Sequence, residues 1–307
     1  MPDIIVHGAS SFIGKHFCKH LIESQKPFTV FARESSNLPF LKNAKNVSVF
    51  RYVNNIEELL DVRLDTRSPM FIDCAWSGVF GSERNNPEQI SVNVPMSISS
   101  VKIAHHFGAC HWAGFGSQAE YGNLNKRISE VDKCYPTTLY GKSKLFCAQI
   151  TSELCQSYKM EHTWFRLFSV FGPDDNHDWL IQYLIKEMLK GNEINVTKAE
   201  QFWDYLYVSD IVLMLEKLMN SKGLGISNLG YGKATQLKFI IDTIKEITQS
   251  NSIINYGAVP YREDQVMFME ADITKISTSL NWQPKVDIQE GLIKTVNYLI
   301  QQSTHAL

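Results

Sequence analysis

Tyr140 and Lys144 are the residues of this chain best suited to move a proton. They stand at i and i+4 in Leu139-Tyr-Gly-Lys-Ser-Lys-Leu-Phe-Cys-Ala-Gln-Ile150, a helical pattern that puts both side chains on one face. A free tyrosine has a pKa of about 10, and a nearby ammonium lowers it by favouring the phenolate. Ser117, at a predicted strand end, could hydrogen-bond the carbonyl oxygen that receives the proton. We therefore predict Ser117, Tyr140 and Lys144 as catalytic residues for general-acid chemistry.

A glycine-rich turn follows the first predicted strand. Residues 3–7 have the pattern of a buried strand, Gly8-Ala-Ser-Ser-Phe-Ile-Gly14 comes next, and residues 15–24 have helical periodicity. This order is the context that a dinucleotide fingerprint requires, although a plain turn between strand and helix is the alternative from these residues alone. The free N–H groups and partial positive charge of a helix start favour a pyrophosphate. The predicted cofactor contacts in this turn are Gly8, Ser10, Ser11, Phe12, Ile13 and Gly14.

The second predicted strand, residues 28–33, ends on a basic residue. An NAD site usually offers an acidic side chain there, which accepts hydrogen bonds from the ribose hydroxyls. Arg33 stands at this point instead, with Ser35 and Ser36 close behind. A guanidinium suits a 2′-phosphate through forked, charge-assisted hydrogen bonds. We therefore expect NADPH as the cofactor and Arg33 as a cofactor-binding residue, with NADH or a merely solvated arginine as the alternatives.

Taken with further segments, these motifs resemble the extended short-chain dehydrogenase/reductase family that acts on nucleotide sugars, over nearly the whole chain. Ile72-Asp-Cys-Ala-Trp76 resembles the family's strand end under the nicotinamide, and Asn93 matches the asparagine that opens its interface helix. The resemblance implies that Tyr140 and Lys144 also hold the nicotinamide ribose. The cofactor contacts that it adds are Cys74, Ala75, Trp76 and Asn93.

The same resemblance implies where a substrate binds. Arg166-Leu-Phe-Ser-Val-Phe-Gly-Pro173 resembles the family's strand that turns toward the sugar, and Arg262 matches an arginine that grips the diphosphate. Trp203 stands where many relatives place an arginine, and its alternatives are stacking on the base or packing in the core. The implied substrate-binding residues are Ser117, Gln118, Tyr140, Ser169 and Arg262.

The expected fold is α/β, a Rossmann-type doubly wound parallel sheet with a smaller C-terminal α/β substrate lobe. Short apolar strands alternate with helical patterns up to about residue 160, as a parallel sheet covered by helices requires. Residues 1–170 are expected to form the NADP-binding Rossmann domain, with a chain return near 203–230. Residues 171–307 are expected to form mainly the sugar-nucleotide-binding lobe. Helical patterns there cover 178–190, 211–220, 237–249 and 289–301.

Departures from the family narrow the activity. Sugar-nucleotide 4,6-dehydratases of the family carry Thr-Asp-Glu in the serine loop, whereas this chain has Ser117-Gln118-Ala119 and lacks those proton carriers. The deoxysugar 3,5-epimerase/reductases use an extra cysteine and histidine. No cysteine follows Ser117, and His177 stands in a loop among aspartates, which is more typical of a solvated turn residue. The activities that remain compatible with these residues are those of a reductase and of a 4-epimerase.

Arg33 favours NADPH and therefore reduction. The predicted activity is NADPH-dependent reduction of the C4 keto group of a nucleotide-activated 4-keto-6-deoxy sugar. The resemblance implies a place in deoxysugar biosynthesis for surface polysaccharide such as O-antigen. An NAD-dependent nucleotide-sugar 4-epimerase is the first alternative, and a non-catalytic dinucleotide-binding protein is the second.

Composition agrees with a cytoplasmic enzyme. The net charge of −2 over 307 residues argues against a nucleic-acid partner, and no apolar run approaches the roughly 20 residues of a membrane helix. Residues 3–7 enter a strand directly, so no signal peptide is expected. Six cysteines without CxxC pairs or clustered histidines indicate reduced thiols and no metal. The expected partners are a CDP-, dTDP- or GDP-linked keto-deoxyhexose and a second copy of the chain, paired through helices near 94–107 and 139–158.

Overall fold

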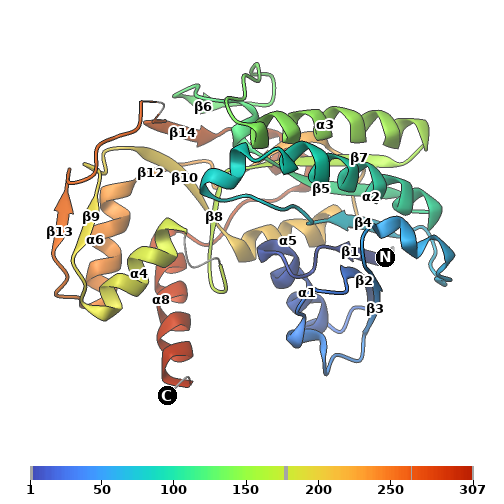
Figure 1. Ribbon diagram of the computed structural model, residues 1–307, viewed down its shortest axis with the longest axis horizontal. Helices are drawn as coiled ribbons and strands as arrows, with labels where there is room; N and C mark the ends of the chain where they lie inside the picture. The colour runs from blue at the N-terminus through green and yellow to red at the C-terminus, as the bar shows by residue number, and fades with distance from the viewer. Residues whose placement is uncertain (1–2, 176–178, 264, 306–307) are drawn as a thin grey trace.

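The computed structural model describes residues 3–175, 179–263 and 265–305, and a seven-stranded parallel sheet forms the centre of its larger lobe (Figure 1). The strand order is β11-β7-β5-β4-β1-β2-β3, so it reverses at β1, between β4 and β2. In open α/β sheets, ligands bind outside the carboxyl ends of the strands at such a point. The strands are β1 (Ile4–His7), β2 (Phe28–Arg33), β3 (Val47–Tyr52), β4 (Met70–Asp73), β5 (His111–Ser117), β7 (Glu161–Leu167) and β11 (Gly225–Leu229).

The register of the sheet brings the carboxyl ends of its central strands together. His7 lies beside Phe31 and Asp73 in the ladder, and Asp73 lies beside Gly114. Every residue of β1, β4 and β5 is buried, because helices cover both faces of the sheet. The residues that follow these strands are therefore delivered to one common edge.

Helices cover both faces of this sheet. On one face, Phe17 of α1 and Ile211 of α5 pack with Val6, and on the other, Val101 of α2 and Cys147 of α3 pack with Ile5. Adjacent strand residues point to opposite faces, so this division identifies a doubly wound sheet and confirms the expected fold class. The helices of this lobe are α1 (Phe12–Glu23), α2 (Val94–His106), α3 (Leu139–Ser157), α5 (Val208–Leu218) and α7 (Thr274–Leu280).

A smaller lobe has its own sheet and core. Strands β12, β10, β14 and β6 lie in that order, β8 pairs with β10, and β9 pairs with β13. Its helices are α4 (Leu180–Lys190), α6 (Leu237–Thr248) and α8 (Ile288–His305). Its strands are β6 (Arg127–Ile128), β8 (Ser169–Phe171), β9 (Ile194–Val196), β10 (Phe202–Tyr207), β12 (Ala234–Gln236), β13 (Ile254–Tyr256) and β14 (Phe268–Ala271).

The chain crosses between the lobes more than once. After β10, helix α5 packs against α1, and β11 joins the edge of the large sheet beside β7. Ile276 and Leu280 of α7 and the following Trp282 belong to the same core. Residues beyond 170 thus supply a strand and two helices to the larger lobe. The assignment of 1–170 to the cofactor and 171–307 mainly to the substrate stays a prediction.

Short helical turns complete the edge of the large sheet. These turns are η1 (Pro39–Leu41), η2 (Ile56–Asp61), η3 (Gly81–Asn85), η4 (Gln89–Asn93) and η5 (Gln118–Glu120). The predicted strand at 28–33 coincides with β2, whereas α1 begins three residues before the predicted start at Lys15. The reason is the Ser11 side chain, which accepts a hydrogen bond from Gly14 N and so starts the helix early.

Candidate active site

Ser117, Tyr140 and Lys144 lie together at the carboxyl edge of the large sheet. Ser117 ends β5, and the other two lie on the first two turns of α3, which packs against that strand. All three are buried, with exposed fractions of 8, 9 and 4%. Hydrogen bonding from the Ser117 side chain lowers the pKa of Tyr140. The structure therefore assembles the three residues that the sequence singled out.

Local sequence explains why α3 starts so close to the serine loop. Thr138 Oγ1 accepts a hydrogen bond from Gly141 N and caps the helix. A Cβ on Gly141 would lie 2.5 Å from the carbonyl oxygen of Ala119, so only glycine allows this approach. The glycine of the Tyr-Gly-Lys-Ser-Lys segment thus sets the distance between Tyr140 and the loop of Ser117.

A buried ion pair between Glu120 and Arg166, which the sequence analysis did not predict, holds the backbone of Ser117. Glu120 Oε2 accepts from Arg166 Nε at 2.7 Å, and Glu120 Oε1 accepts from Ser117 N and Trp164 Nε1, each at 2.9 Å. The carboxylate is fully buried, and a buried charge of this kind requires such a partner. The pair fixes the backbone of Ser117. Glu120 and Arg166 stand in two separate segments of the sequence, and nothing along the chain shows that they meet.

The acidity of Tyr140 is set by opposing influences. Burial raises its pKa, the Ser117 hydrogen bond and the positive charge of Arg84 lower it, and the charge of Glu120 raises it. The Arg84 guanidinium carbon lies 4.7 Å from the centroid of the Tyr140 ring. Arg84 comes from η3 and no motif in the sequence pointed to it.

The Lys144 ammonium lies closer to Phe115 of β5 and to Trp76 than to the ring of Tyr140. Its Nζ donates to the carbonyl oxygen of Phe115 at 2.5 Å and lies 3.5 Å from the centroid of a Trp76 ring. Its distance to the centroid of the Tyr140 ring is 5.8 Å. Burial lowers the pKa of Lys144 to about 8. The sequence assigned the control of Tyr140's acidity to Lys144, whereas in the structure the positive charge of Arg84 lowers the pKa of Tyr140.

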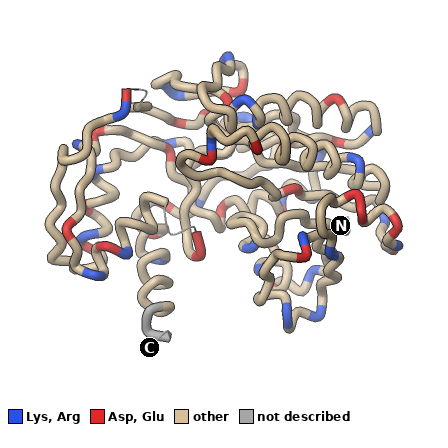
Figure 2. Tube along the Cα trace, in the orientation of Figure 1, with Lys and Arg blue, Asp and Glu red and all other residues tan. Residues whose placement is uncertain are grey.

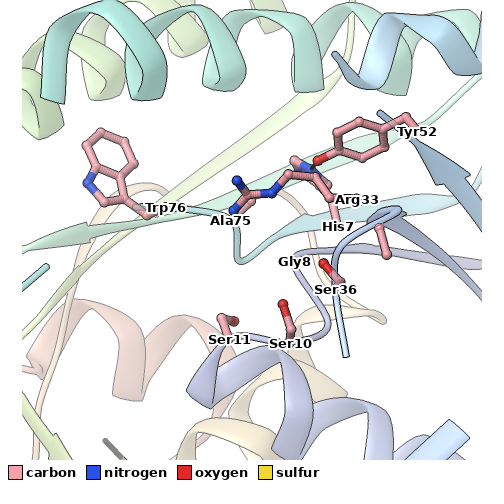
Figure 3. Close-up of a pocket in the computed structure, with 10 residues that line it drawn as sticks. His7, Gly8, Ser10, Ser11, Arg33, Ser36, Tyr52, Ala75 and Trp76 are labelled. Carbon is pink, nitrogen blue, oxygen red and sulfur yellow. Dashed lines mark hydrogen bonds between the residues drawn. The ribbon is translucent and has the colours of Figure 1, made fainter. Parts of the chain in front are cut away.

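A cavity of about 210 Å³ opens between the glycine turn and the ends of β2 and β4 (Figure 3). Gly8 has φ +81°, and a Cβ there would lie 2.5 Å from Ala75 N. A Cβ on Gly14 would lie 2.3 Å from Gly8 O. Bare backbone therefore forms this wall. The cavity is lined by His7, Gly8, Ser10, Ser11, Ala32, Arg33, Ser36, Tyr52, Ala75 and Trp76.

The donors around this cavity fit a dinucleotide. Phe12 and Ile13 begin α1, and the N–H groups of a first helical turn have no partner within the helix, so they suit a pyrophosphate. Ser10 and Ser11 add hydroxyls at the same turn, and the Arg33 side chain extends across the cavity toward Ala75 (Figure 3). A cationic, amide-rich cleft matches the charge of a dinucleotide phosphate.

Arg51 of β3, absent from the predicted site, holds the turn that carries Arg33. Its Nη1 donates to the carbonyl oxygens of Arg33, Glu34 and Ser36 at 3.0–3.1 Å. One guanidinium thus shapes the backbone of the whole turn. The contact depends on the pairing of β2 with β3, which no local sequence pattern displays.

The remaining predicted cofactor residues divide into two groups. Ala75 and Trp76 line the cavity, whereas Cys74 is buried beside them and burial raises the pKa of its thiol. Asn93 is 1% exposed, and its amide bonds the backbone N and O of Ser77 at 2.9 Å. These bonds occupy the Asn93 amide and hold the loop that follows Trp76.

The structure places the other predicted substrate residues on separate elements. Gln118 begins η5 directly after Ser117, and Ser169 lies half-buried on β8. Arg262 is exposed in the segment between β13 and β14. Trp203 packs partly buried in the smaller lobe and donates to the carbonyl oxygen of Val266 at 2.9 Å, a core position. His177 lies outside the described residues.

Surface charge is mixed over the described residues. Figure 2 shows Lys and Arg interspersed with Asp and Glu along both lobes. Within the ranges that the structure covers, no three His, Cys, Asp or Glu side chains are grouped as a metal site would require. In the same ranges, no helix combines the length and apolarity needed to cross a bilayer.

A Rossmann sheet with a glycine turn, and a serine, tyrosine and lysine at its carboxyl edge, defines a dinucleotide-dependent short-chain dehydrogenase/reductase of the extended type. The chain belongs to the NAD dependent epimerase/dehydratase family, whose model matches residues 4–230. The family resemblance noted in the sequence is thereby confirmed, and the protein is a nucleotide-sugar-modifying enzyme of this class.

Relatives of different activity share the whole length of the chain. It is similar to the CDP-abequose synthase of Salmonella muenchen, at 25% identity over 96% of this chain and 97% of that protein. Among solved structures it resembles the UDP-glucose 4-epimerase of Thermotoga maritima with UDP-glucose (TM-score 0.85, 23% identity, 98% and 99% covered). It also resembles the dTDP-glucose 4,6-dehydratase of Bacillus anthracis in complex with NAD (TM-score 0.84, 19% identity, 99% and 98% covered). At these identities the solved structures show a common fold.

Proposed function

We propose that this protein is an NADPH-dependent reductase of the C4 keto group of a nucleotide-activated 4-keto-6-deoxy sugar. The observation that carries the proposal is the burial of Ser117, Tyr140 and Lys144 together at the carboxyl edge of the large sheet. Gln118 and Ala119 follow in the loop where elimination would need carboxyl groups. The site can therefore protonate an alkoxide but lacks, in that loop, the acid and base of a dehydratase.

The chain's own groups act on the C4 carbonyl. The Ser117 and Tyr140 hydroxyls would donate hydrogen bonds to the carbonyl oxygen and polarise it. Tyr140 then gives its proton to the oxygen as negative charge develops there. Bound NADPH would supply the hydride that C4 accepts. Lys144, a buried cation beside Trp76, would hold the nicotinamide ribose and place its charge near the reacting centre.

The preference for NADPH is supported by Arg33 at the end of β2 and by Ser36 beside it in the cleft. Because the dehydratase of similar fold is an NAD complex, NADH is the alternative cofactor to be compared directly. The similarity to CDP-abequose synthase supports a CDP-linked keto-deoxyhexose as the first substrate to try, followed by dTDP- and GDP-linked ones. We place the reaction in the cytoplasm, in deoxysugar supply for surface polysaccharide.

A nucleotide-sugar 4-epimerase is the second candidate. The observation in its favour is the shared fold, together with a Ser-Tyr-Lys set that serves oxidation and reduction equally well. An epimerase would keep NAD bound through the cycle, so Arg33 at the ribose end of the cleft favours the reductase. A purely non-catalytic role has less support, because Tyr140 and Lys144 are both present and buried together.

The test is NADPH oxidation, followed by absorbance, with CDP-, dTDP- and GDP-linked 4-keto-6-deoxyhexoses generated in the cuvette by their dehydratases. We expect stoichiometric loss of NADPH with one nucleotide and a smaller kcat/KM with NADH. Tyr140→Phe should bind NADPH normally and lose about 10²- to 10⁴-fold in kcat, because it removes the proton donor. No oxidation with any sugar, together with NAD retained by the purified protein, would favour the epimerase.

A further inference from the structure

Arg84 occupies a place in the active site that the triad does not explain. It belongs to η3, in the loop between β4 and α2, and its guanidinium carbon lies 4.7 Å from the centroid of the Tyr140 ring. The Arg84 side chain is half-buried, and its Nε–H is buried without a hydrogen-bond partner among the described residues. A buried donor left unpaired costs free energy, so its position calls for a role.

The loop around Arg84 is held from two sides. On one side, Asn85 Oδ1 accepts from the backbone N of Leu139 at 3.1 Å, and Leu139 directly precedes Tyr140. On the other, the Gln89 side chain donates to the carbonyl oxygens of Glu83 (3.1 Å) and Gly78, while its Oε1 accepts from Trp76 Nε1. The residues on both sides of Arg84 are thus tied to α3 and to the cofactor cleft.

Other charged groups near Tyr140 are committed elsewhere. Lys144, on the same helix, directs its ammonium to Phe115 O and to Trp76. Glu120, from η5, is paired with Arg166 and its negative charge opposes a phenolate. Ser117 of β5 is uncharged. By distance to the ring centroid, Arg84 is the nearer of the two cations, at 4.7 Å against 5.8 Å for Lys144.

We propose that Arg84 is a positioning residue of the reaction, a second cation that acts through Tyr140 by stabilising its phenolate. The inference rests on the proposed role of Tyr140 as the proton donor. During reduction the O–H bond of Tyr140 breaks, a new O–H bond forms on the C4 oxygen, and the phenolate stays charged until a solvent proton replaces the one lost. The hydride comes from the reduced nicotinamide cofactor named above.

Physical chemistry favours an arginine for this task. A guanidinium keeps its charge at any working pH and stacks on aromatic faces, and a partly buried cation near a ring interacts more strongly than an exposed one. The charge of Arg84 lowers the pKa of Tyr140, against the rise that burial causes. Because Lys144 itself has its pKa lowered to about 8, Arg84 supplies positive charge at pH values where the lysine loses its own.

The test measures the acidity of residue 140 without substrate or cofactor. Position 140 is filled with 3,5-difluorotyrosine, whose phenol is more acidic than that of tyrosine, so that its ¹⁹F signal titrates where the fold persists. We expect Arg84→Gln to raise this pKa by about one unit, in line with the loss of one nearby cation, and Arg84→Lys to retain most of the effect. Arg127→Gln, which removes an exposed arginine paired with Asp272, is the matched control and should leave it unchanged.

The same variants are then assayed in the unlabelled enzyme. Arg84→Gln should lower kcat about tenfold, shift the basic limb of the pH profile upward and leave the KM for the keto sugar nearly unchanged. Equal ¹⁹F pKa values in Arg84→Gln and Arg127→Gln would overturn the inference. A rise in KM with kcat unchanged would also overturn the inference, because Arg84 would then act as a substrate-binding group. If Arg84→Gln raises the pKa of residue 140 as expected but the enzyme reduces no keto sugar, the electrostatic role of Arg84 is supported. Only the proposed reaction is then rejected.

Discussion

At the scale of single residues, the burial of the Lys144 ammonium costs the folded protein stability. Its ammonium is buried between β5 and Trp76, with one carbonyl oxygen and one aromatic face as partners. Desolvation exceeds these compensations, since the pKa of Lys144 falls from its ordinary 10.5 to about 8. Burial in the folded protein therefore disfavours the charged form of Lys144.

This cost predicts a pH-dependent stability difference. Between pH 8 and 10.5 the unfolded chain still binds the proton that folded Lys144 has released, so the unfolding free energy rises with pH in that window. Relative to Lys144→Met, the wild type should gain about 1–3 kcal/mol from pH 8 to 10.5. Urea unfolding at several pH values measures the difference.

Lys142→Met is the matched control for that experiment, because Lys142 is exposed on the same helix. Its difference from the wild type should be flat across the window. A flat profile for Lys144→Met as well would show that Lys144 is not desolvated.

At the scale of elements, the β1–α1 turn works through backbone contact. The turn bears directly on the end of β4, where a Cβ on Gly8 would lie 2.5 Å from Ala75 N. The same closeness leaves the first amides of α1 facing the cavity. Both the path of the backbone in this turn and the position of the first N–H groups of α1 therefore depend on Gly8.

Replacing this glycine should damage both fold and binding. Gly8→Ala combines a left-handed φ of +81° with a backbone clash, whereas Gly108→Ala has φ +69° and nothing within 4 Å. We expect Gly108→Ala to cost about 1–2 kcal/mol in unfolding free energy, from φ alone, and Gly8→Ala to cost more. Only Gly8→Ala should weaken NADPH binding, by tenfold or more in a fluorescence titration. Equal effects of the two variants on stability and binding would show that the close approach to β4 has no role.

At the scale of the whole molecule, the carboxylate of Asp174 ties helix α1 to the smaller lobe. Asp174 accepts from Lys19 of α1 at 2.6 Å and also from the hydroxyl of Tyr298 in α8. His16 of α1 hydrogen-bonds the carbonyl oxygen of Pro173 at 2.7 Å. Helix α1 is thus joined to the segment that leads into the smaller lobe.

We propose that the whole enzyme is a homodimer paired through α2 and α3, which lie side by side on one outer face (Figure 1). Phe146 of α3 is 49% exposed on that pair, as an interface side chain would be in the separated subunit. Phe146→Glu should convert the dimer to a monomer in light scattering, because it would bury an unpaired charge.

Phe239→Glu on α6, where the ring is 43% exposed, is the matched control and should keep the mass of the dimer. A wild-type monomer would reject the proposed assembly altogether. A dimer that survives Phe146→Glu would move the interface to another face.

The sequence by itself determined the features that follow local rules. The glycine turn, the i and i+4 pair of Tyr140 and Lys144, and the strand at 28–33 depend on neighbours along the chain, and each was predicted from them. The doubly wound sheet followed from the alternation of strands and helices. The predicted start of α1 was wrong by three residues, because the capping contact of Ser11 decides where that helix begins.

Only the tertiary structure decided which groups surround the triad. Glu120 meets Arg166 from 46 residues away, Arg51 reaches the turn after β2 through strand pairing, and Arg84 meets Tyr140 across the cleft. The register of the sheet and the path of the loop after β4 create these contacts. No spacing in the sequence encodes them, because they join segments whose distance is set by packing.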